Sequence, residues 1–172
     1  EEKEAMQQVL SLERIPDAMK RCMIDASELE LTEKLGAGAF GEVWRASLNG
    51  TPVAVKKLHR NRLDEANLQA FRAEFELQLT LRHFNLVQIL GGSWTLDDVN
   101  VCIIFELCEN GTLQDLLERM PNLSWAVHKL DMALGVARGM AYLHAQSPPV
   151  LHRDLKPENV LIDAGFQAKI AD

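Results

Sequence analysis

Val150-Leu-His-Arg-Asp-Leu-Lys-Pro-Glu-Asn159 places an imidazole, a carboxylate, an ammonium group and an amide within one short stretch. A proline inside the stretch and apolar segments on either side of it predict a loop rather than a helix. Loops that are held by rigid elements often carry catalytic residues. The stretch is therefore a candidate catalytic loop, and the rest of the chain should contain the elements that hold it.

The composition of the whole chain sets the class of protein. With 172 residues and 47% hydrophobic composition, the chain is long enough to bury a core as a globular domain. Its net charge of −7 offers no basic surface for nucleic acid. Three cysteines without a Cys-x-x-Cys pair favour a reducing compartment over a disulfide framework or a zinc site. The sequence has no apolar run long enough to predict a membrane span. A cytoplasmic location, or the cytoplasmic side of a larger protein, is therefore expected.

Two different patterns occupy the first part of the chain. Met6, Val9 and Leu10 at helical spacing predict a short amphipathic helix over Glu1–Arg14, either a packing or linker segment or a regulatory, dimerising one. From Leu29 the apolar residues alternate instead, which predicts strands. Five strands are expected in all, and they form one sheet. The last two of these predicted strands are Leu86–Leu90 and Val101–Phe105.

Glycines at positions 36, 38 and 41 interrupt the first of these strands. A Gly-x-Gly-x-x-Gly pattern alone is weak evidence, and in a dinucleotide-binding domain it must open a helix. Here it leads into a hairpin, because Asn49-Gly50 is a strong signal for a tight turn between two strands. The pattern therefore predicts a flap between two strands, where missing side chains let backbone N–H groups approach phosphate oxygens. An ordinary glycine-rich hairpin is the alternative.

Lys56 ends the apolar strand Val53-Ala-Val-Lys and needs an anionic partner if it is partly buried. Asp64–Leu81 contains no Gly or Pro and predicts a helix that offers Glu74 as this partner. At about 4 Å and an effective dielectric constant near 20, such a pair gains roughly 4 kcal/mol of Coulomb energy before desolvation is subtracted. The inward face of the helix is expected to carry Ala70, Glu74, Leu77 and Leu81.

Helices are predicted for the part of the chain that follows the strands. Thr112-Leu-Gln-Asp115 is a capping box that opens a short helix to Glu118. Ser124 can cap a long helix that ends near His144. The apolar stripe of this helix includes Leu130, Leu134, Ala137 and Ala141.

The order of these motifs resembles the eukaryotic protein-kinase domain, from about Leu29 to Asp172. The resemblance rests on four motifs in sequence: the glycine loop with Val43, the strand lysine, the helix glutamate, and the His-Arg-Asp-Leu-x-x-x-Asn loop. It implies an α+β bilobal fold with a five-stranded antiparallel sheet and one helix in the first lobe. It further implies an N-terminal extension over 1–28, a kinase N-lobe over 29–106 and part of a helical C-lobe over 107–172.

The resemblance implies a role for each residue that is expected to contact ATP, Mg²⁺ or the substrate. Lys56, paired with Glu74, would contact the α- and β-phosphates. Asp154 would accept the proton of the substrate hydroxyl, and Lys156 would stabilise charge on the transferred group. Asn159 and Asp172 would hold Mg²⁺. The remaining residues expected around ATP are Leu35, Gly36, Gly38, Gly41 and Val43 in the flap, and Ala54, Phe105, Glu106, Cys108 and Leu161 around adenine.

The resemblance narrows further to serine/threonine kinases. The Lys156-Pro-Glu-Asn sequence is similar to theirs, and a protein Ser or Thr is the expected substrate. Four further features resemble those of the tyrosine-kinase-like group, to which Raf and mixed-lineage kinases belong. They are the Ile24-Asp-x-Ser-Glu-Leu lead-in, Trp44, Gly91-Gly92 and Ser124-Trp125. Asp172 corresponds to the Asp of the family's Asp-Phe-Gly. The chain is therefore expected to be an incomplete domain, inactive by itself, without the helix against which Leu134 and Ala141 would pack.

Alternatives to catalysis stay open at this point. Gln78 stands one turn after Glu74, where the family usually has a bulky apolar residue, so a pseudokinase or a nucleotide-binding regulatory scaffold is the second hypothesis. A dimer of kinase domains or a regulatory partner is possible. His152 is expected to bond the backbone of its loop rather than act as a base, and Cys108 to be an inert thiol.

Overall fold

The computed structural model describes residues 20–38, 41–59, 65–95 and 100–171. The chain divides into two compact units, of which the first comprises Glu1–Thr80 and Ile89–Leu107 and the second Leu81–Gln88 and Cys108–Asp172. The helix predicted for Glu1–Arg14 lies outside the described residues. Within the described ranges, no helix has the length and apolar character needed to cross a membrane.

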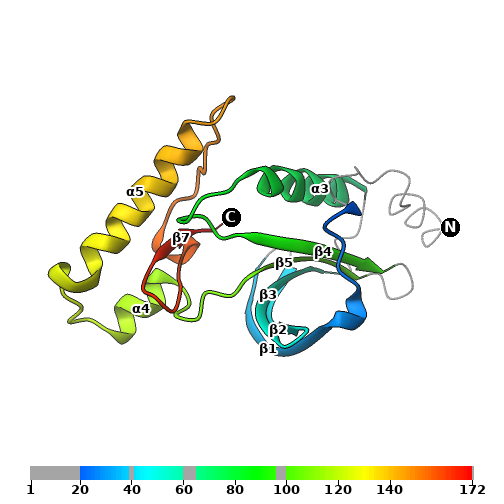
Figure 1. Cartoon of the computed structure of the whole chain (residues 1–172), viewed down its shortest axis with the longest axis horizontal. Coiled ribbons are helices and arrows are strands. Elements are labelled where there is room, and N and C mark those ends of the chain that lie inside the picture. The colour runs from blue at the N-terminus through cyan, green and yellow to red at the C-terminus, as the bar shows by residue number, and fades with distance from the viewer. Residues whose placement is uncertain (1–19, 39–40, 60–64, 96–99, 172) are drawn as a thin grey trace. The chain divides into compact units, whose positions relative to one another are not determined.

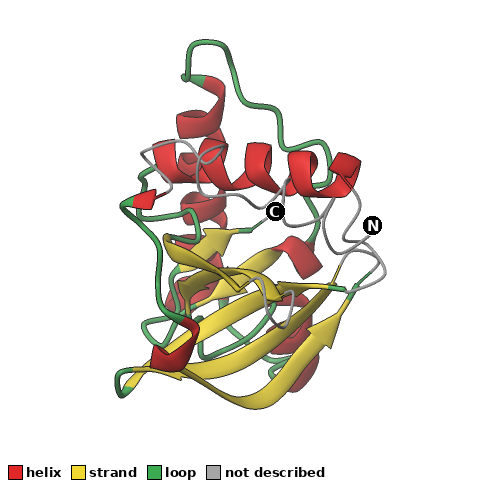
Figure 2. Ribbon diagram, turned by 90° about the vertical axis from the view of Figure 1, so that its right-hand side faces the viewer, coloured by secondary structure: helices red, strands yellow, loops and turns green. Residues whose placement is uncertain are grey.

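The first unit is built on a five-stranded antiparallel sheet, which confirms the predicted α+β architecture (Figure 2). Asn49 and Gly50 have φ angles of 49° and 85°, so both adopt the positive φ that the predicted tight turn requires. In space the strands follow the order β1-β2-β3-β5-β4. Their bounds are β1 Leu29–Ala37, β2 Gly41–Leu48, β3 Thr51–Leu58, β4 Ile89–Thr95 and β5 Asn100–Glu106.

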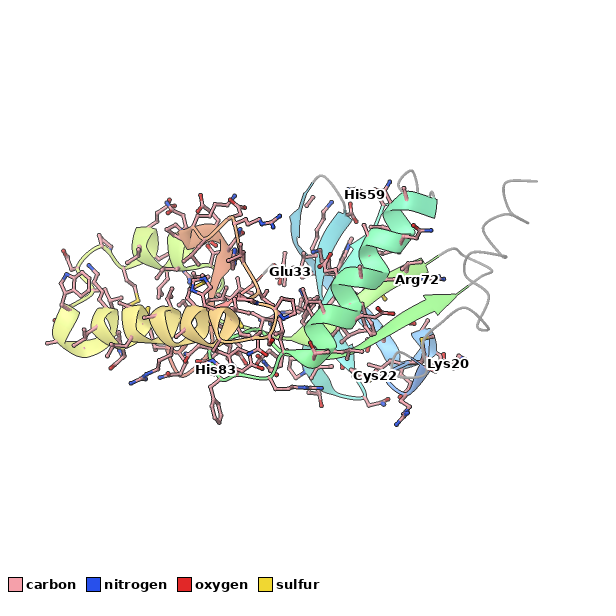
Figure 3. All side chains as sticks on the ribbon, turned by 90° about the horizontal axis from the view of Figure 1, so that it is seen from above. Lys20, Cys22, Glu33, His59, Arg72 and His83 are labelled. Atoms are coloured by element: carbon pink, nitrogen blue, oxygen red, sulfur yellow. The ribbon has the colours of Figure 1, made fainter. Side chains whose placement is uncertain are left out.

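Helix α3 (Glu65–Thr80) covers one face of this sheet (Figures 1 and 3). Among the side chains of this helix whose burial the structure describes, Phe71 and Phe75 are the buried ones, with 5% and 0% of their surface exposed. The predicted inward stripe is wrong for Ala70 and Leu77, which are exposed, whereas Glu74 meets Lys56 of the sheet as predicted. Aromatic rings bury more surface than Ala or Leu, so the helix turns its two Phe residues to the sheet. The strand residues packed with them are Leu58, Ile89, Val101 and Ile103.

The opposite face of the sheet holds a second apolar cluster. Its fully buried members come from the three central strands, and Cys102 is among them. Burial raises the pKa of the Cys102 thiol to about 11, so this thiol stays protonated at neutral pH. The other buried members are Ala46, Val53, Val55 and Ile104.

A short extended segment lies along the outer edge of β4. The Ile24 N–H donates to the Gly92 carbonyl at 2.9 Å, and the Gly92 N–H donates to the Cys22 carbonyl at 3.0 Å. A Cβ on Gly91 would lie 2.4 Å from the Cys22 carbonyl oxygen. The Gly91-Gly92 pair thus allows residues that precede β1 to come close to the sheet.

The predicted strand Leu86–Leu90 is divided between the two units. Strand β4 begins at Ile89, whereas Leu86 forms an isolated bridge with Ile170 in the second unit. The Val87 N–H donates to the Ile170 carbonyl at 2.9 Å. The apolar run predicts one strand, because periodicity does not show that its two halves pair with different partners.

The second unit contains the predicted helices. Helix α4 (Leu113–Arg119) begins with the predicted capping box, in which Thr112 and Asp115 bond each other's backbone N–H. Ser124 caps the next helix, and its Oγ accepts from the Ala126 N–H at 3.1 Å. This helix is not uniform, since a π-helical turn at Trp125–Lys129 precedes helix α5 at Leu130–His144.

Helix α5 buries a stripe of residues that is separate from its predicted apolar stripe, in which Leu134 and Ala141 are expected to pack against a further helix. Its buried residues are Met132, Gly135, Gly139 and Leu143. The predicted stripe of Leu130, Leu134, Ala137 and Ala141 is exposed among the described residues. Two glycines on the buried side allow close contact with Asn85, whose buried Nδ2 donates to the Ala168 carbonyl at 2.8 Å. The helix is therefore apolar on both sides.

Replacing Gly139 by alanine is expected to destabilise the protein, although alanine favours a helix by about 1 kcal/mol over glycine. The new Cβ would lie 2.7 Å from the Asn85 carbonyl oxygen and 2.8 Å from Ile170 Cδ1. Overpacking of this kind costs about 1–3 kcal/mol, which urea denaturation can measure. Ala137→Gly, at an exposed position of the same helix, calibrates propensity alone. A more stable Gly139→Ala variant would contradict the packing.

Two short strands that the sequence did not predict as a pair complete the second unit. They are β6 (Val160–Ile162) and β7 (Ala168–Ile170), which form an antiparallel hairpin directly after the candidate loop. Five of these six residues are buried. The hairpin therefore fixes the end of the loop to the core of its unit.

Candidate active site

Lys56 and Glu74 form the predicted ion pair in the first unit. Lys56 Nζ donates to Glu74 Oε1 at 2.9 Å, and the two side chains are 23% and 35% exposed. The pairing holds because Phe75, the next residue of α3, is buried against the sheet and Glu74 stands at the edge of that contact. The lysine is thus fixed at the surface of the sheet.

Gln78 lies one turn after Glu74 on α3 and is partly buried. Its Oε1 is buried and has no hydrogen-bond partner among the described residues. A buried acceptor in this state costs about 1–3 kcal/mol. The expectation that a polar residue disfavours this arrangement of α3 has a physical basis in this atom.

The glycine-rich loop joins β1 to β2. The Gly38 N–H donates to the Gly41 carbonyl at 2.8 Å, which closes the turn. A Cβ on Gly36 or Gly38 would meet nothing within 4 Å, whereas one on Gly41 would lie 2.1 Å from the Lys57 carbonyl oxygen. Gly41 is therefore required by the close approach of β3, and the space beside Gly36 and Gly38 is open.

A side-chain network that sequence reasoning missed joins the two strands of this loop. Lys34 Nζ lies 2.6 Å from Glu42 Oε1, and Trp44 Nε1 donates to Glu42 Oε2 at 3.0 Å. The hydrogen bond from Lys34, followed by that from Trp44, holds the pKa of the Glu42 carboxyl below its usual value. Opposite charges on paired strands were the available signal, but only the register shows which residues meet.

Three of the residues predicted around ATP in the first unit, Val43, Ala54 and Phe105, share one face of the sheet. Ala54 lies opposite Phe105, and Val43 lies opposite Lys56. Directly opposite residues of an antiparallel pair point to the same face. This is the face that α3 covers. Leu35 is 47% exposed at an irregularity of β1, and Glu106 is the last residue of β5.

The candidate loop of the second unit brings three polar side chains together. Asn159 Nδ2 donates to the Asp154 backbone carbonyl and to Asp154 Oδ2, each at 2.9 Å. Lys156 Nζ lies 2.8 Å from the same Oδ2. Arg153 has a φ of 63°, an unusual value that turns the chain immediately before Asp154. The loop thus presents an exposed carboxylate between an ammonium group and an amide.

These neighbours shift the ionisation of the loop. The hydrogen bond from Lys156 is the largest cause that holds the pKa of Asp154 below its usual value, and the amide of Asn159 acts in the same direction. Conversely, the bond to Asp154 raises the pKa of Lys156. At neutral pH the loop therefore carries an ionised Asp154, which can accept a hydrogen bond from a hydroxyl group.

His152 bonds the backbone, as predicted. Its Nδ1 faces the Asp154 N–H at 3.4 Å, and its Nε2 lies 3.0 Å from the Ala171 carbonyl oxygen. Acceptance at Nδ1 leaves the ring proton on Nε2, which donates to Ala171. The imidazole therefore ties the loop to the residue that follows β7.

Two further predicted residues, Leu161 and Cys108, lie in the second unit. Leu161 in β6 forms an isolated bridge with Thr112, the cap residue of α4. Cys108 is 7% exposed, which limits access to its thiol and agrees with the expectation of an inert cysteine.

The two residues expected to hold a metal differ in what the structure shows. Asp172 lies outside the described residues. The amide nitrogen of Asn159 donates to Asp154, which fixes the side chain. The amide oxygen can then act as a metal ligand. An amide oxygen and a carboxylate are hard ligands of the kind that Mg²⁺ prefers, so the residues present fit the ion.

Comparison with known proteins agrees with these observations. Residues 29–172 match the family described as protein tyrosine and serine/threonine kinase. The chain is 37% identical over 150 residues to drkB, a probable serine/threonine-protein kinase of Dictyostelium discoideum, covering 87% of the chain and 21% of drkB. It is 38% identical over 156 residues to SIS8, a probable serine/threonine-protein kinase of Arabidopsis thaliana, covering 91% of the chain and 15% of SIS8.

A third relative is HERK 1 of Arabidopsis thaliana, a receptor-like protein kinase. The identity is 39% over 145 residues, which cover 82% of the chain and 17% of HERK 1. The chain thus spans about a fifth or less of the length of these three relatives.

Proposed function

The chain belongs to the protein tyrosine and serine/threonine kinase family, and from this we propose that it transfers the γ-phosphoryl group of ATP to a hydroxyl group of a protein. The observation that carries the proposal is the ionised Asp154, held between Lys156 and Asn159 on an exposed loop. A carboxylate in this state can orient a substrate hydroxyl and accept its proton.

Each unit carries residues with a separate task in this proposal. In the first unit, Lys56 binds the α- and β-phosphates, and Glu74 holds the lysine in place. In the second unit, Asp154 accepts the proton of the hydroxyl group, and Lys156 stabilises the negative charge of the transferred group in the transition state. This division of work supports a catalyst rather than a scaffold, since the charged residues that transfer requires are all present.

The remaining predicted residues are proposed to bind the adenine ring and Mg²⁺. The adenine ring is proposed to bind against Val43, Ala54 and Leu161, with backbone groups of Glu106 and Cys108 as hydrogen-bond partners and Phe105 behind the ring. Asn159 and Asp172 would hold Mg²⁺, which neutralises phosphate charge when it is bound. Local positive groups of this kind explain how a chain of net charge −7 could bind a polyanion.

Serine or threonine is proposed as the acceptor residue. The Lys156-Pro-Glu-Asn sequence supports this choice, and so does the similarity to drkB and SIS8, which are probable serine/threonine-protein kinases. We also place the chain in the tyrosine-kinase-like group. The Gly91-Gly92 pair, which allows the lead-in segment at Ile24 to approach β4, is the structural support for that subgroup.

A transfer assay with γ-labelled ATP tests the proposed function. The protein that carries this chain should label a mixed peptide library on Ser or Thr and not on Tyr, in the presence of Mg²⁺. Matched peptides that differ only in the acceptor residue serve as the control. No label on any peptide would contradict the kinase proposal, and label on Tyr would contradict the choice of acceptor.

A further inference from the structure

His59, labelled in Figure 3, follows directly after the last residue of β3. Its Nε2 lies 3.3 Å from the Gly38 carbonyl oxygen. Gly41, at the other end of the same turn, lies opposite Leu58 in the sheet. A side chain at the end of the strand that carries Lys56 therefore contacts the backbone of the loop between β1 and β2.

The Gly38 carbonyl is an atom whose direction matters for a phosphate ligand. Glycine has no Cβ to restrict its backbone, so the peptide group that follows it can rotate at little cost. A Cβ at Gly38 would meet nothing within 4 Å, so packing does not fix this residue. A carbonyl oxygen that turned toward phosphate oxygens would repel them, because both carry negative charge.

We propose that His59 is a positioning residue for the glycine-rich turn, whose Nε2–H holds the Gly38 carbonyl away from the phosphates of a bound nucleotide. The inference rests on the proposed function, because it requires that this loop meets phosphates. His59 is not among the residues that the sequence predicts around ATP. The contact also connects the loop to β3, so the turn and the lysine of the same strand are placed by one element.

The hydrogen bond needs a proton on Nε2, but it does not need a positive charge on the ring. The neutral Nε2–H tautomer and the imidazolium both donate to a carbonyl oxygen, so His59 can hold the turn in either state. Donation without charge also means that an amide can replace the ring. Glutamine places its Nε2 at about the reach of histidine Nε2, whereas leucine and phenylalanine offer no donor.

The test compares nucleotide binding by wild type, His59→Leu, His59→Phe and His59→Gln. Titration calorimetry with Mg·ATP and, separately, with adenosine gives the two affinities for each variant. A net hydrogen bond of this length is worth the lower part of the usual range, so ATP affinity should fall about 2- to 5-fold in the Leu and Phe variants. Adenosine affinity should not change, and glutamine should restore ATP binding. His144→Leu, at an exposed position on α5, is the control.

The possible outcomes separate this inference from the proposed function. Unchanged ATP affinity in the Leu and Phe variants would overturn the role of His59, as would an equal loss for ATP and adenosine. Failure of glutamine to restore binding would also overturn it, since the proposal depends on the donor. If thermal melts show both variants unfolded, His59 is structural and the inference fails. A wild type that binds no ATP would overturn the proposed function as well.

Discussion

Replacing Asp154 by asparagine is expected to lower kcat for phosphoryl transfer by roughly 100- to 10,000-fold, the usual contribution of a general base. Asparagine has nearly the same shape but cannot accept the proton of the substrate hydroxyl. The KM for ATP should change little, because Asp154 is proposed to contact the acceptor and not the nucleotide. Steady-state assays with labelled ATP and a Ser or Thr peptide measure both quantities.

Asp131→Asn is the matched control for this experiment. Asp131 lies exposed in the first turn of α5, in the same unit as Asp154. The two variants lose the same charge, so a shared effect would reflect the electrostatics of the unit rather than catalysis. Retention of wild-type kcat by Asp154→Asn would remove the loop from the mechanism.

Replacing Lys56 by methionine should lower kcat by roughly 100- to 1,000-fold, because a preorganised positive charge at the phosphates is lost. The change also leaves Glu74 without the ammonium group that it pairs with at 2.9 Å. Binding of adenosine should survive, since Lys56 is proposed to contact phosphates alone. Transfer assays and adenosine titration together test both statements.

Lys57→Met provides the comparison for Lys56→Met. Lys57 is the next residue of β3 and lies opposite Cys102, so its side chain leaves the sheet on the other face. Both variants remove one lysine from the same strand. Equal losses in the two would show that general destabilisation of β3, and not the position of Lys56, explains the effect.

Local chemistry made part of the fold predictable from the sequence. The Thr112–Asp115 capping box and the Asn49-Gly50 turn depend on residues a few positions apart, and both are present. The pairing of Lys56 with Glu74 was also predictable, because a strand lysine needs an anionic partner. Each of these features follows from bonding requirements that the residues carry with them.

Features that depend on distant partners were missed or misplaced. The division of the Leu86–Leu90 run follows from its pairing with Ile170, which no local pattern reveals. The π-helical turn at Trp125–Lys129 contains no Gly or Pro that would predict an irregular helix there. The buried face of α3 was misplaced because two Phe residues outweighed the regular spacing of smaller ones.

The segment of residues 22–24 occupies part of the outer edge of β4. Strand β4 is the last in the sheet, and an uncovered outer strand offers a template for pairing with another molecule. The bonds of Cys22 and Ile24 to Gly92 occupy part of that template. Residues that precede the first strand therefore cover backbone groups of β4 with which a strand of another molecule could pair, and a domain boundary drawn at Leu29 would leave those groups uncovered.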